Sequence, residues 1–207
     1  MPQSKKARAD KNSGRRDPAK TRDAILAVAG KLLGRDGPEG LSVSQVAQLA
    51  GVNRGTAYHH FQTREQLLDA TMQWVSAKLV NEVFPDYDPD HWVPKNRPRD
   101  TNDKLADFMA ANPEFGAAWV HSVIINGGFE LDPFWRIYHQ QHEHFAETDR
   151  AQPDIDAEAH AFQTICGVML MPYWVRGRGV TDRQRKALLE RYKKESLRQA
   201  QHGMIKR

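Results

Sequence analysis

The chain has 207 residues, a length of one large domain or two small ones, and 40% of them are hydrophobic, which is enough for a buried core and excludes wholesale disorder. Its single cysteine, Cys166, excludes an intramolecular disulfide and a zinc site built from several cysteines. The net charge of +4 is uneven, because residues 1–80 hold 13 Lys and Arg against 7 Asp and Glu, whereas residues 81–207 hold 17 against 19. This asymmetry is typical of a chain that meets a polyanion at one end, although a solvated basic tail gives it as well.

No stretch of the sequence resembles a secretory signal or a membrane span. Residues 1–20 are rich in Lys and Arg and have no apolar stretch behind them. The longest run without an acidic or basic residue, 159–175, contains Pro172 and several polar side chains and is too short to cross a bilayer. We therefore expect a soluble, cytoplasmic protein without a membrane partner.

Turn and capping signals predict helices along the whole chain, and no stretch makes a convincing strand. Residues 1–16 are polar, basic and aperiodic, which is typical of a disordered arm. Four helices are then expected, each opened by a side chain that can cap its first turn. The first opens at Asp17-Pro18 and closes at Gly34 and Gly37, and the second opens at Ser42 with Gln45 and stops at Gly51. The third runs from Arg54 to His60 with Asn53 as its cap, and the fourth opens at Thr63 with Gln66.

A loop rich in proline and aspartate, residues 84–100, separates these helices from the rest of the chain. Five more helices are expected, at about 102–111, 113–127, 133–148, 154–175 and 181–201. Caps and helical periodicity therefore predict an all-α fold of about nine helices, with a compact N-terminal group of short helices before a helical C-terminal part.

Residues 42–64 predict two short helices that cross closely. The small side chain of Ala47 permits the close crossing, and Gly51 permits the positive φ of a tight turn. Ala57 and Phe61 then pack the second helix onto the first. The outward positions of the second helix all carry groups that can form hydrogen bonds or approach a ligand closely: Asn53, Arg54, Thr56, Tyr58, His59 and His60. The Ala…Gly spacing alone also fits an ordinary helical hairpin.

The same region resembles the N-terminal DNA-binding region of the TetR (tetracycline repressor) family of bacterial transcriptional regulators. The resemblance covers residues 17–79, about 60 of the 207 residues, and its most specific string runs from Ala50 to Phe61. The matching features are Asp17-Pro18, the Gly37…Gly40-Leu41-Ser42 turn, Val46-Ala47, Ala50-Gly51-Val52, Gly55-Thr56, Tyr58-His59-His60-Phe61 and Glu65-Gln66-Leu67-Leu68. One departure is Ala57, where the family usually carries a larger apolar residue, so we expect looser packing of the second helix.

The resemblance implies a three-helix helix-turn-helix DNA-binding domain at residues 17–62 and a helical effector-binding and dimerisation domain at residues 63–207. It implies that Asn53, Arg54, Gly55 and Thr56 face base edges, and that Tyr58, His60 and Arg64 hold the phosphate backbone. Arg54 is the side chain in this set that can make a bidentate contact with guanine O6 and N7. Ser42, Ser44 and Thr63 belong to the expected interface because amides at helix N-termini can donate to phosphates. Whether His59 contacts DNA is left open.

The helix expected at 154–175 carries apolar residues on two faces, so it needs a partner on each. The resemblance implies that the second partner is another copy of the chain, in a four-helix bundle; two-sided burial within a monomer is the alternative. The expected homodimer interface consists of Phe162, Cys166, Met169, Tyr173, Leu189 and Tyr192.

Aromatic side chains gather in the middle helices and could line a pocket for a small apolar or aromatic effector. The candidate effector-binding residues are Phe108, Trp119, His121, Phe134, Trp135 and Tyr138, although each could equally be an ordinary core residue.

A histidine cluster, His139, His142 and His144 with Glu143, has spacings that a helical zinc site could use. Its glutamine and glutamate neighbours favour a solvated face, so we expect no metal, and whether the cluster binds one is left open. No other cofactor and no catalytic residue is predicted.

The sequence therefore predicts a homodimeric DNA-binding transcriptional regulator, a repressor that releases double-stranded operator DNA when a small molecule binds the C-terminal half. One alternative is a DNA-binding regulator that answers to a protein partner or to no effector. A helical enzyme is a weaker alternative, because no nucleophile–base pair, phosphate loop or metal signature is present.

Overall fold

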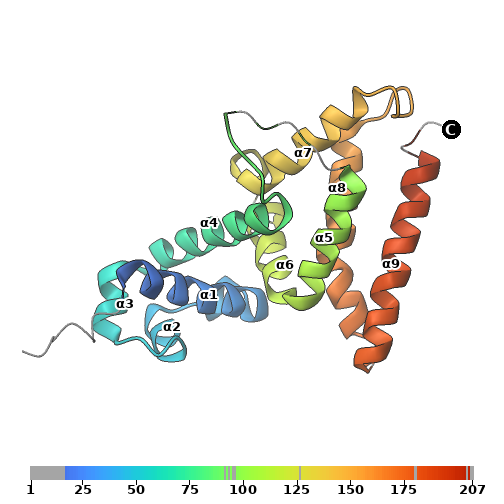
Figure 1. Ribbon diagram of the computed structural model, residues 1–207. Helices are drawn as coiled ribbons and strands as arrows, with labels where there is room; N and C mark the ends of the chain where they lie inside the picture. Colours follow the sequence, from blue (N-terminus) through green and yellow to red (C-terminus); the bar gives the residue numbers. More distant parts are fainter. Residues whose placement is uncertain are drawn as a thin grey trace, which may run out of the picture.

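A computed structural model of the chain (Figure 1) describes residues 17–90, 92, 94, 97–125, 127–179, 181–203 and 205. These residues form nine α-helices and no strand beyond one isolated bridge between Ala151 and Ile205, so the predicted all-α fold is confirmed for the described part of the chain. None of the described helices is long and apolar enough to cross a membrane. The predicted disordered arm, residues 1–16, lies outside the described residues.

The N-terminal helices begin where their caps predict. The side chains of Asp17, Ser42, Asn53 and Thr63 each accept a backbone N–H of the following helix, at 2.8–3.2 Å. The elements are α1 (Pro18–Asp36), the 3-10 turn η1 (Pro38–Gly40), α2 (Val43–Leu49), α3 (Arg54–His60) and α4 (Arg64–Val83). Each cap accepts a hydrogen bond from a backbone amide that has no acceptor within its own helix, so these boundaries follow from local sequence.

The C-terminal helices differ from prediction at three boundaries. The elements are α5 (Pro98–Ala111), α6 (Pro113–Trp119), the π-helical turn η2 (Val120–Ile125), the 3-10 turn η3 (Phe129–Leu131), α7 (Pro133–Ala146), α8 (Ala157–Arg176) and α9 (Asp182–Gly203). α5 begins four residues earlier than predicted, because Pro98 fits a first helical turn. α8 is capped by Asp156, whereas Asp154 has a φ of 60°. The single helix predicted over 113–127 divides into α6 and η2.

The described residues form two large hydrophobic cores, besides a small cluster around Phe145 and Ala151. The smaller core joins α1, α2, α3 and the first turns of α4, which we call the head; the larger one joins the remaining helices, which we call the body. The domain boundary between residues 62 and 63 stays a prediction, because the two cores share helices on both sides of it. Leu67 of α4 belongs to the head core, whereas Leu33 of α1 belongs to the body core, so α1 and α4 each contribute to both.

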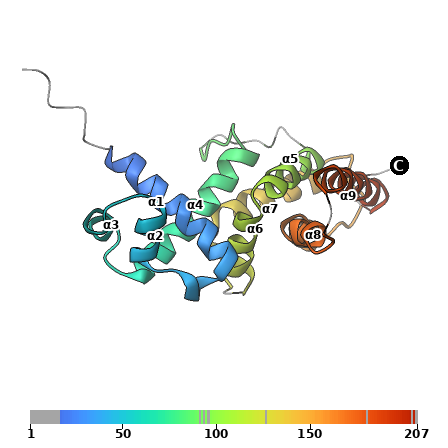
Figure 2. The ribbon, with the colours of Figure 1, turned by 90° about the horizontal axis from the view of Figure 1, so that it is seen from below.

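The end of α1 lies directly against the start of α6 (Figures 1 and 2). A Cβ placed on Gly34 would lie 1.9 Å from the carbonyl oxygen of Glu114, and one on Gly30 would lie 3.2 Å from the ring of Phe115. The sequence predicted that Gly34 helps to end α1. Gly34 instead lies within α1 and permits a backbone-to-backbone contact between head and body.

Gly34→Ala should lower the free energy of unfolding by about 3 kcal/mol, because the new methyl group meets backbone that cannot rotate away. Gly203→Ala, at the open end of α9 where a Cβ would meet nothing within 4 Å, is the matched control and should change stability by less than about 1 kcal/mol. Urea unfolding measures both. Equal stabilities of the two variants would contradict the contact.

Candidate nucleic-acid interface

α2 and α3 form the helix-turn-helix that the sequence predicted. Gly51 has a φ of 64°, and the amide of Val52 donates to the carbonyl oxygen of Ala47 at 2.9 Å, which closes the turn. Ala57 and Phe61 are almost fully buried and pack α3 onto the head core. The small side chain of Ala57 is completely covered, so the looser packing expected there leaves no exposure at this position.

The opposite face of α3 is exposed at the end of the molecule remote from α9 (Figure 1). Arg54, Gly55 and Thr56 lie on it, and the structure gives the Arg54 guanidinium no ion pair among the described residues. Asn53 is exposed too, but its side-chain oxygen Oδ1 accepts the amide N–H of Gly55 at 2.8 Å. Asn53 therefore caps α3 and keeps its NH₂ group for any base or phosphate.

The polar residues further along α3 face the same side. Tyr58 is 46% exposed, and its hydroxyl lies 3.3 Å from that of Ser44, which links α3 to α2. His59 is exposed and His60 is half-buried. Partial burial, with His59 and Arg22 nearby, lowers the pKa of His60, which disfavours its charged form.

The two helix N-termini expected to meet phosphates differ from each other. At α2, Ser42 accepts the amide of Gln45 and no carboxylate lies in the first turn. At α4, hydrogen bonds from its own backbone amide and from Thr63 lower the pKa of Glu65. A carboxylate therefore lies at the start of α4, where the sequence predicted a phosphate.

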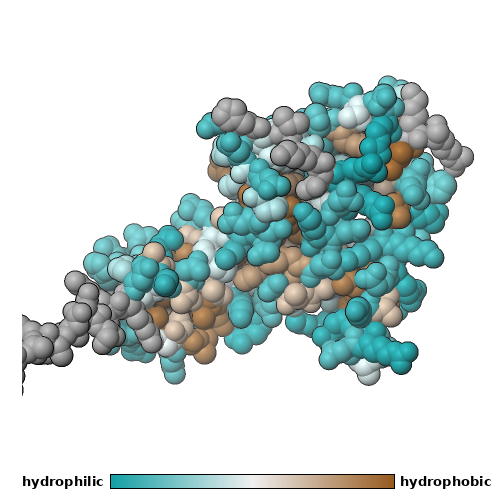
Figure 3. All heavy atoms as spheres, in the orientation of Figure 1, coloured by the Kyte–Doolittle hydropathy of each residue, from teal (hydrophilic) through white to brown (hydrophobic). Residues whose placement is uncertain are grey.

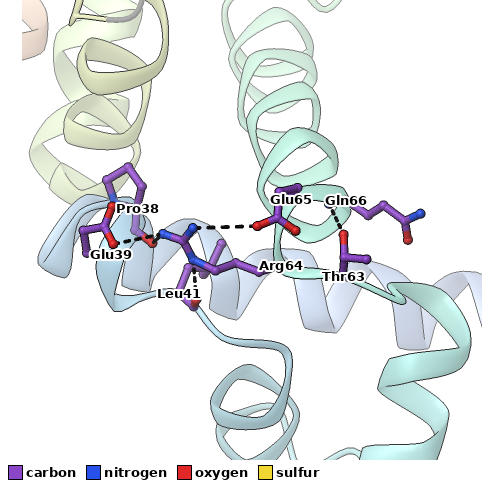
Figure 4. A network of polar contacts seen from close by, with 7 residues as sticks. All are labelled: Pro38, Glu39, Leu41, Thr63, Arg64, Glu65 and Gln66. Atoms are coloured by element: carbon purple, nitrogen blue, oxygen red, sulfur yellow. Dashed lines mark hydrogen bonds and ion pairs between the residues drawn. The ribbon is translucent and has the colours of Figure 1, made fainter.

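The guanidinium of Arg64, which the sequence predicted to contact phosphate, lies against the turn between α1 and α2. Its Nε donates to the carbonyl oxygen of Leu41 at 3.1 Å, and its Nη2 donates to that of Pro38 at 2.6 Å (Figure 4). Glu39 and Glu65 lie 3.5 and 4.0 Å from the guanidinium. In the free chain the Arg64 guanidinium is thus engaged by contacts within the chain, and its phosphate contact stays a prediction.

The basic excess of the first 80 residues lies mostly outside the described part. Residues 17–80 hold 7 Lys and Arg against 6 Asp and Glu, whereas residues 1–16 hold 6 against 1. The described head is therefore close to neutral, and a long-range attraction to a polyanion would come from residues 1–16.

Most of the residues predicted to bind an effector belong to the body core. Trp119, Phe134 and Tyr138 are at most 1% exposed, and Trp135 is 6% exposed. The indole of Trp119 donates to Asp132 at 3.1 Å and packs edge-on against Phe134. Phe108 and His121 are only half-buried, with Phe108 stacked on Phe115. These aromatics pack against one another, and their contact with an effector stays a prediction.

A hollow of about 1100 Å³ lies elsewhere, where the second half of α9 diverges from α5 and α8. Residues that line it include Asn102, Asp103, His160, Gln163, Gly167, Trp174 and Tyr192, none of them predicted as effector contacts. Nδ1 of His160 is buried and has no hydrogen-bond partner among the described residues. A charged wall with buried donors and acceptors suits a ligand that carries polar groups.

α8 has an inner face in the body core and an outer apolar face. Phe162 and Tyr173 are 41% and 39% exposed, as an interface needs, and Cys166 is half-buried. Leu170 and Trp174, 50% and 40% exposed, belong to this outer face as well. Their positions, four and eight residues after Cys166, continue the apolar spacing from Phe162 and could have been found in the sequence.

Three residues predicted for a dimer interface also make contacts within the chain. Met169 is completely buried, next to Gly116 of α6. Leu189 and Tyr192 pack against the body core, with the Tyr192 hydroxyl close to Gly167. α9 turns mainly charged side chains outward, and in Figure 3 most of the visible face is hydrophilic, with apolar side chains showing beside the upper part of α9.

The histidine cluster of α7 is divided between different surroundings. His142 is completely buried, its Nδ1 lies 2.8 Å from the carbonyl oxygen of Tyr138, and burial lowers its pKa to about 4. His139 stacks on Trp135, and His144 is exposed. Among the described residues, no group of three His, Cys, Asp or Glu is placed to hold a metal ion.

Comparison with known proteins agrees with the geometry of the head. Residues 25–71 match the family model of bacterial regulatory proteins, tetR family. This match covers most of the head.

Curated relatives match over the same region. The HTH-type transcriptional regulator BetI of Rhizobium meliloti (strain 1021) is 36% identical over 62 residues, 30% of each chain. The HTH-type transcriptional regulator CymR of Pseudomonas putida is 38% identical over 60 residues, 29% of this chain and 30% of that one. The chain thus matches less than a third of the length of these relatives, and both are described as regulators, not enzymes.

Solved structures share the fold beyond the TetR-family head. A bacterial regulatory protein of the tetR family from Rhodococcus RHA1 has a TM-score of 0.64 at 19% identity, over 90% of this chain and 99% of that one. A putative TetR-family regulator from Vibrio parahaemolyticus has a TM-score of 0.60 at 23% identity, over 90% and 100%. At these identities, the likeness extends to the arrangement of the body helices and no further.

Arg54→Ala should weaken binding to a preferred DNA duplex by about 1–3 kcal/mol and relax the preference at one base pair in each half-site, because a bidentate guanine contact is lost. Lys31→Ala, on the exposed side of α1, is the control and should bind as the wild type does. Fluorescence anisotropy with the preferred and a scrambled duplex measures both. Equal losses on the two duplexes would show that Arg54 holds the DNA backbone and reads no base.

Proposed function

We propose that the chain is a DNA-binding transcriptional regulator that reads double-stranded operator DNA with α3. The exposed face of α3, with Arg54 uncommitted and Ala57 and Phe61 anchoring the helix, carries this proposal. The match of residues 25–71 to the tetR family and the regulators named among the relatives support it. Lys and Arg residues of the segment 1–16 would add sequence-independent attraction to the phosphates.

Selection of binding sites from random-sequence DNA by the full chain tests this function. A single reading helix contacts few base pairs, so we expect enriched sites with two-fold symmetry and half-sites about 34 Å apart. An absence of enrichment for any sequence would overturn the proposal. Upstream positions of the selected site would then show which genes are regulated, and reporter assays would show whether the protein represses them.

The chain is also proposed to act as a homodimer through the outer face of α8. Phe162, Leu170, Tyr173 and Trp174 together expose an apolar surface that a monomer leaves in water. Two-fold operators need two heads held at a fixed spacing, so an isologous contact along α8 suits the function.

Two adjacent residues of α8 separate interface from core. Leu170→Glu should give a folded monomer that binds the selected duplex at least tenfold more weakly, because residue 170 is half exposed. Met169→Glu should lose helicity, because it buries an unpaired carboxylate. Analytical ultracentrifugation and circular dichroism measure the two outcomes.

Ala187→Glu, on the exposed side of α9, is the matched control for added charge and should remain dimeric. A Leu170→Glu variant that sediments as the wild type does would contradict an interface on α8. A wild type that is monomeric at micromolar concentration would remove the dimer altogether.

The regulator is further proposed to be a repressor that a small molecule releases from DNA by binding in the hollow between α5, α8 and α9. The ligand would prefer a conformation in which the two heads no longer fit adjacent half-sites. The printed title of one structural neighbour, a putative regulator from Saccharomonospora viridis, describes it in complex with choline. The polar wall around His160 favours a ligand with hydrogen-bonding groups over the purely apolar one expected from sequence.

Thermal-shift screening of a library of small amines, carboxylates and phenols tests this site. A compound that raises the Tm of the wild type and weakens its DNA binding should do neither with His160→Leu. Without compound, that variant should be at least as stable as the wild type, because it removes a buried nitrogen that has no partner. His144→Leu, at an exposed position of α7, is the control. A response that survives His160→Leu would place the site elsewhere, and no response from any compound would favour a regulator without an effector.

A further inference from the structure

The Arg64 side chain joins two segments of the head that are 23 residues or more apart in sequence. Its guanidinium lies between the start of α4 and the turn that links α1 to α2 (Figure 4). We propose that Arg64 is a positioning residue, which fixes α2 relative to α4 by bridging the carbonyl oxygens of Pro38 and Leu41, and that it does not contact DNA. The inference rests on the proposed DNA-binding function of the head.

Hydrogen bonds fix the backbone position from which the Arg64 side chain extends. Arg64 is the first residue of α4, directly after the cap Thr63, whose hydroxyl accepts the amide of Gln66 at 3.1 Å. The side chain of Gln66 in turn accepts the amide of Gln62 at 2.9 Å. These reciprocal bonds define the first turn of α4, so the guanidinium extends from a fixed point.

The carbonyl groups that Arg64 contacts belong to the tight turn η1 and the residue after it, between α1 and α2. Pro38 O already accepts the amide of Leu41 at 3.1 Å across η1, and Arg64 adds a second, charged donor. Leu41 is 2% exposed, and the donor that the structure gives its carbonyl oxygen is Arg64. Because a buried carbonyl without a partner costs free energy, this bond stabilises the backbone one residue before the cap of α2.

The bridge completes a closed ring of helices. Ser42 starts α2 directly after Leu41, α2 packs on α3, and α3 returns to α4 through the three residues 61–63. Besides Arg64, α2 is joined to α4 through α3, through packing against α1 and through the shared head core that includes Leu67. The angle at which α3 presents Arg54 and Thr56 therefore depends in part on this guanidinium.

The charges around Arg64 oppose a contact with DNA. Glu39 and Glu65 flank the guanidinium at 3.5 and 4.0 Å, so the three side chains together carry a net charge of -1. A phosphate that approached this group would meet two carboxylates and would compete with two carbonyl oxygens for the same N–H groups.

Arg64→Lys separates positioning from charge. Lysine keeps the positive charge but has a single donor centre, which cannot bridge two carbonyl groups as the fork of arginine does. With a duplex selected by the wild type, we expect Arg64→Lys and Arg64→Ala each to bind about tenfold more weakly. The slope of log K against log salt should stay as in the wild type, because no phosphate contact is lost.

Arg35→Lys is the matched control, because Arg35 pairs with Asp36 in water at the end of α1. It should bind the selected duplex as the wild type does. Circular dichroism and Tm confirm that each variant is folded, and NMR of the free wild type supplies a second readout. The Nε–H of Arg64 should give a signal protected from exchange without DNA, and that signal should be missing from Arg64→Lys.

Three results would overturn the proposal. One is wild-type affinity of Arg64→Lys combined with a salt slope that falls by about one in Arg64→Ala, which is the behaviour of a phosphate contact. Another is the absence of a protected Nε–H signal from the free protein. A third is a variant so unstable that it does not fold although that signal is present, which would assign Arg64 to stability alone. Failure of the wild type to bind any duplex would refute DNA binding itself, an outcome distinct from these three.

Discussion

The contact between α1 and α6 at Gly34 sets the relation of head to body. A glycine is required there because the carbonyl of Glu114 occupies the place of a Cβ. Two helix backbones that touch without side chains between them cannot slide by a fraction of a turn without a clash. The neighbouring residues depend on this contact, since Leu33 reaches the body core only because α1 ends against α6.

The head is held together internally by contacts that α1 makes with α4 and with the end of α3. The indole of Trp74 donates to Asp23, and the guanidinium of Arg22 lies over the ring of Phe61, 5.4 Å from its centroid. With the Arg64 bridge, these contacts favour motion of α1, α2, α3 and α4 as one unit. A change in the body would therefore reach α3 through α4 and α6 rather than by rearranging the head, and η2, the irregular π-helical turn, follows α6 directly.

Local signals predicted the parts of the structure that depend on local physics. Asn53 and Thr63 cap α3 and α4 as expected, because a cap needs only the residues of one turn. Predictions that depended on distant neighbours were less successful. Nothing in the sequence near Met169 indicates that α6 covers it, and nothing near Arg64 indicates that two carbonyl oxygens lie within its reach. Trp119 and Phe134 fit a core and a pocket equally well by sequence, and the structure adds that their rings pack edge-on against each other.

The geometry of α8 links the two proposed activities of the body. Trp174 lines the hollow and also belongs to the outer apolar face, and the guanidinium of Arg178 lies 4.7 Å from its ring centroid. A ligand in the hollow would contact the Trp174 side chain on one side, and a second copy of the chain would contact it on the other. The head is held together by internal contacts and contacts the body at Gly34. Ligand binding would therefore change the angle between the two copies more readily than the structure of either head. Release from a two-fold operator would then need no rearrangement of either head, only a spacing that no longer matches the half-sites.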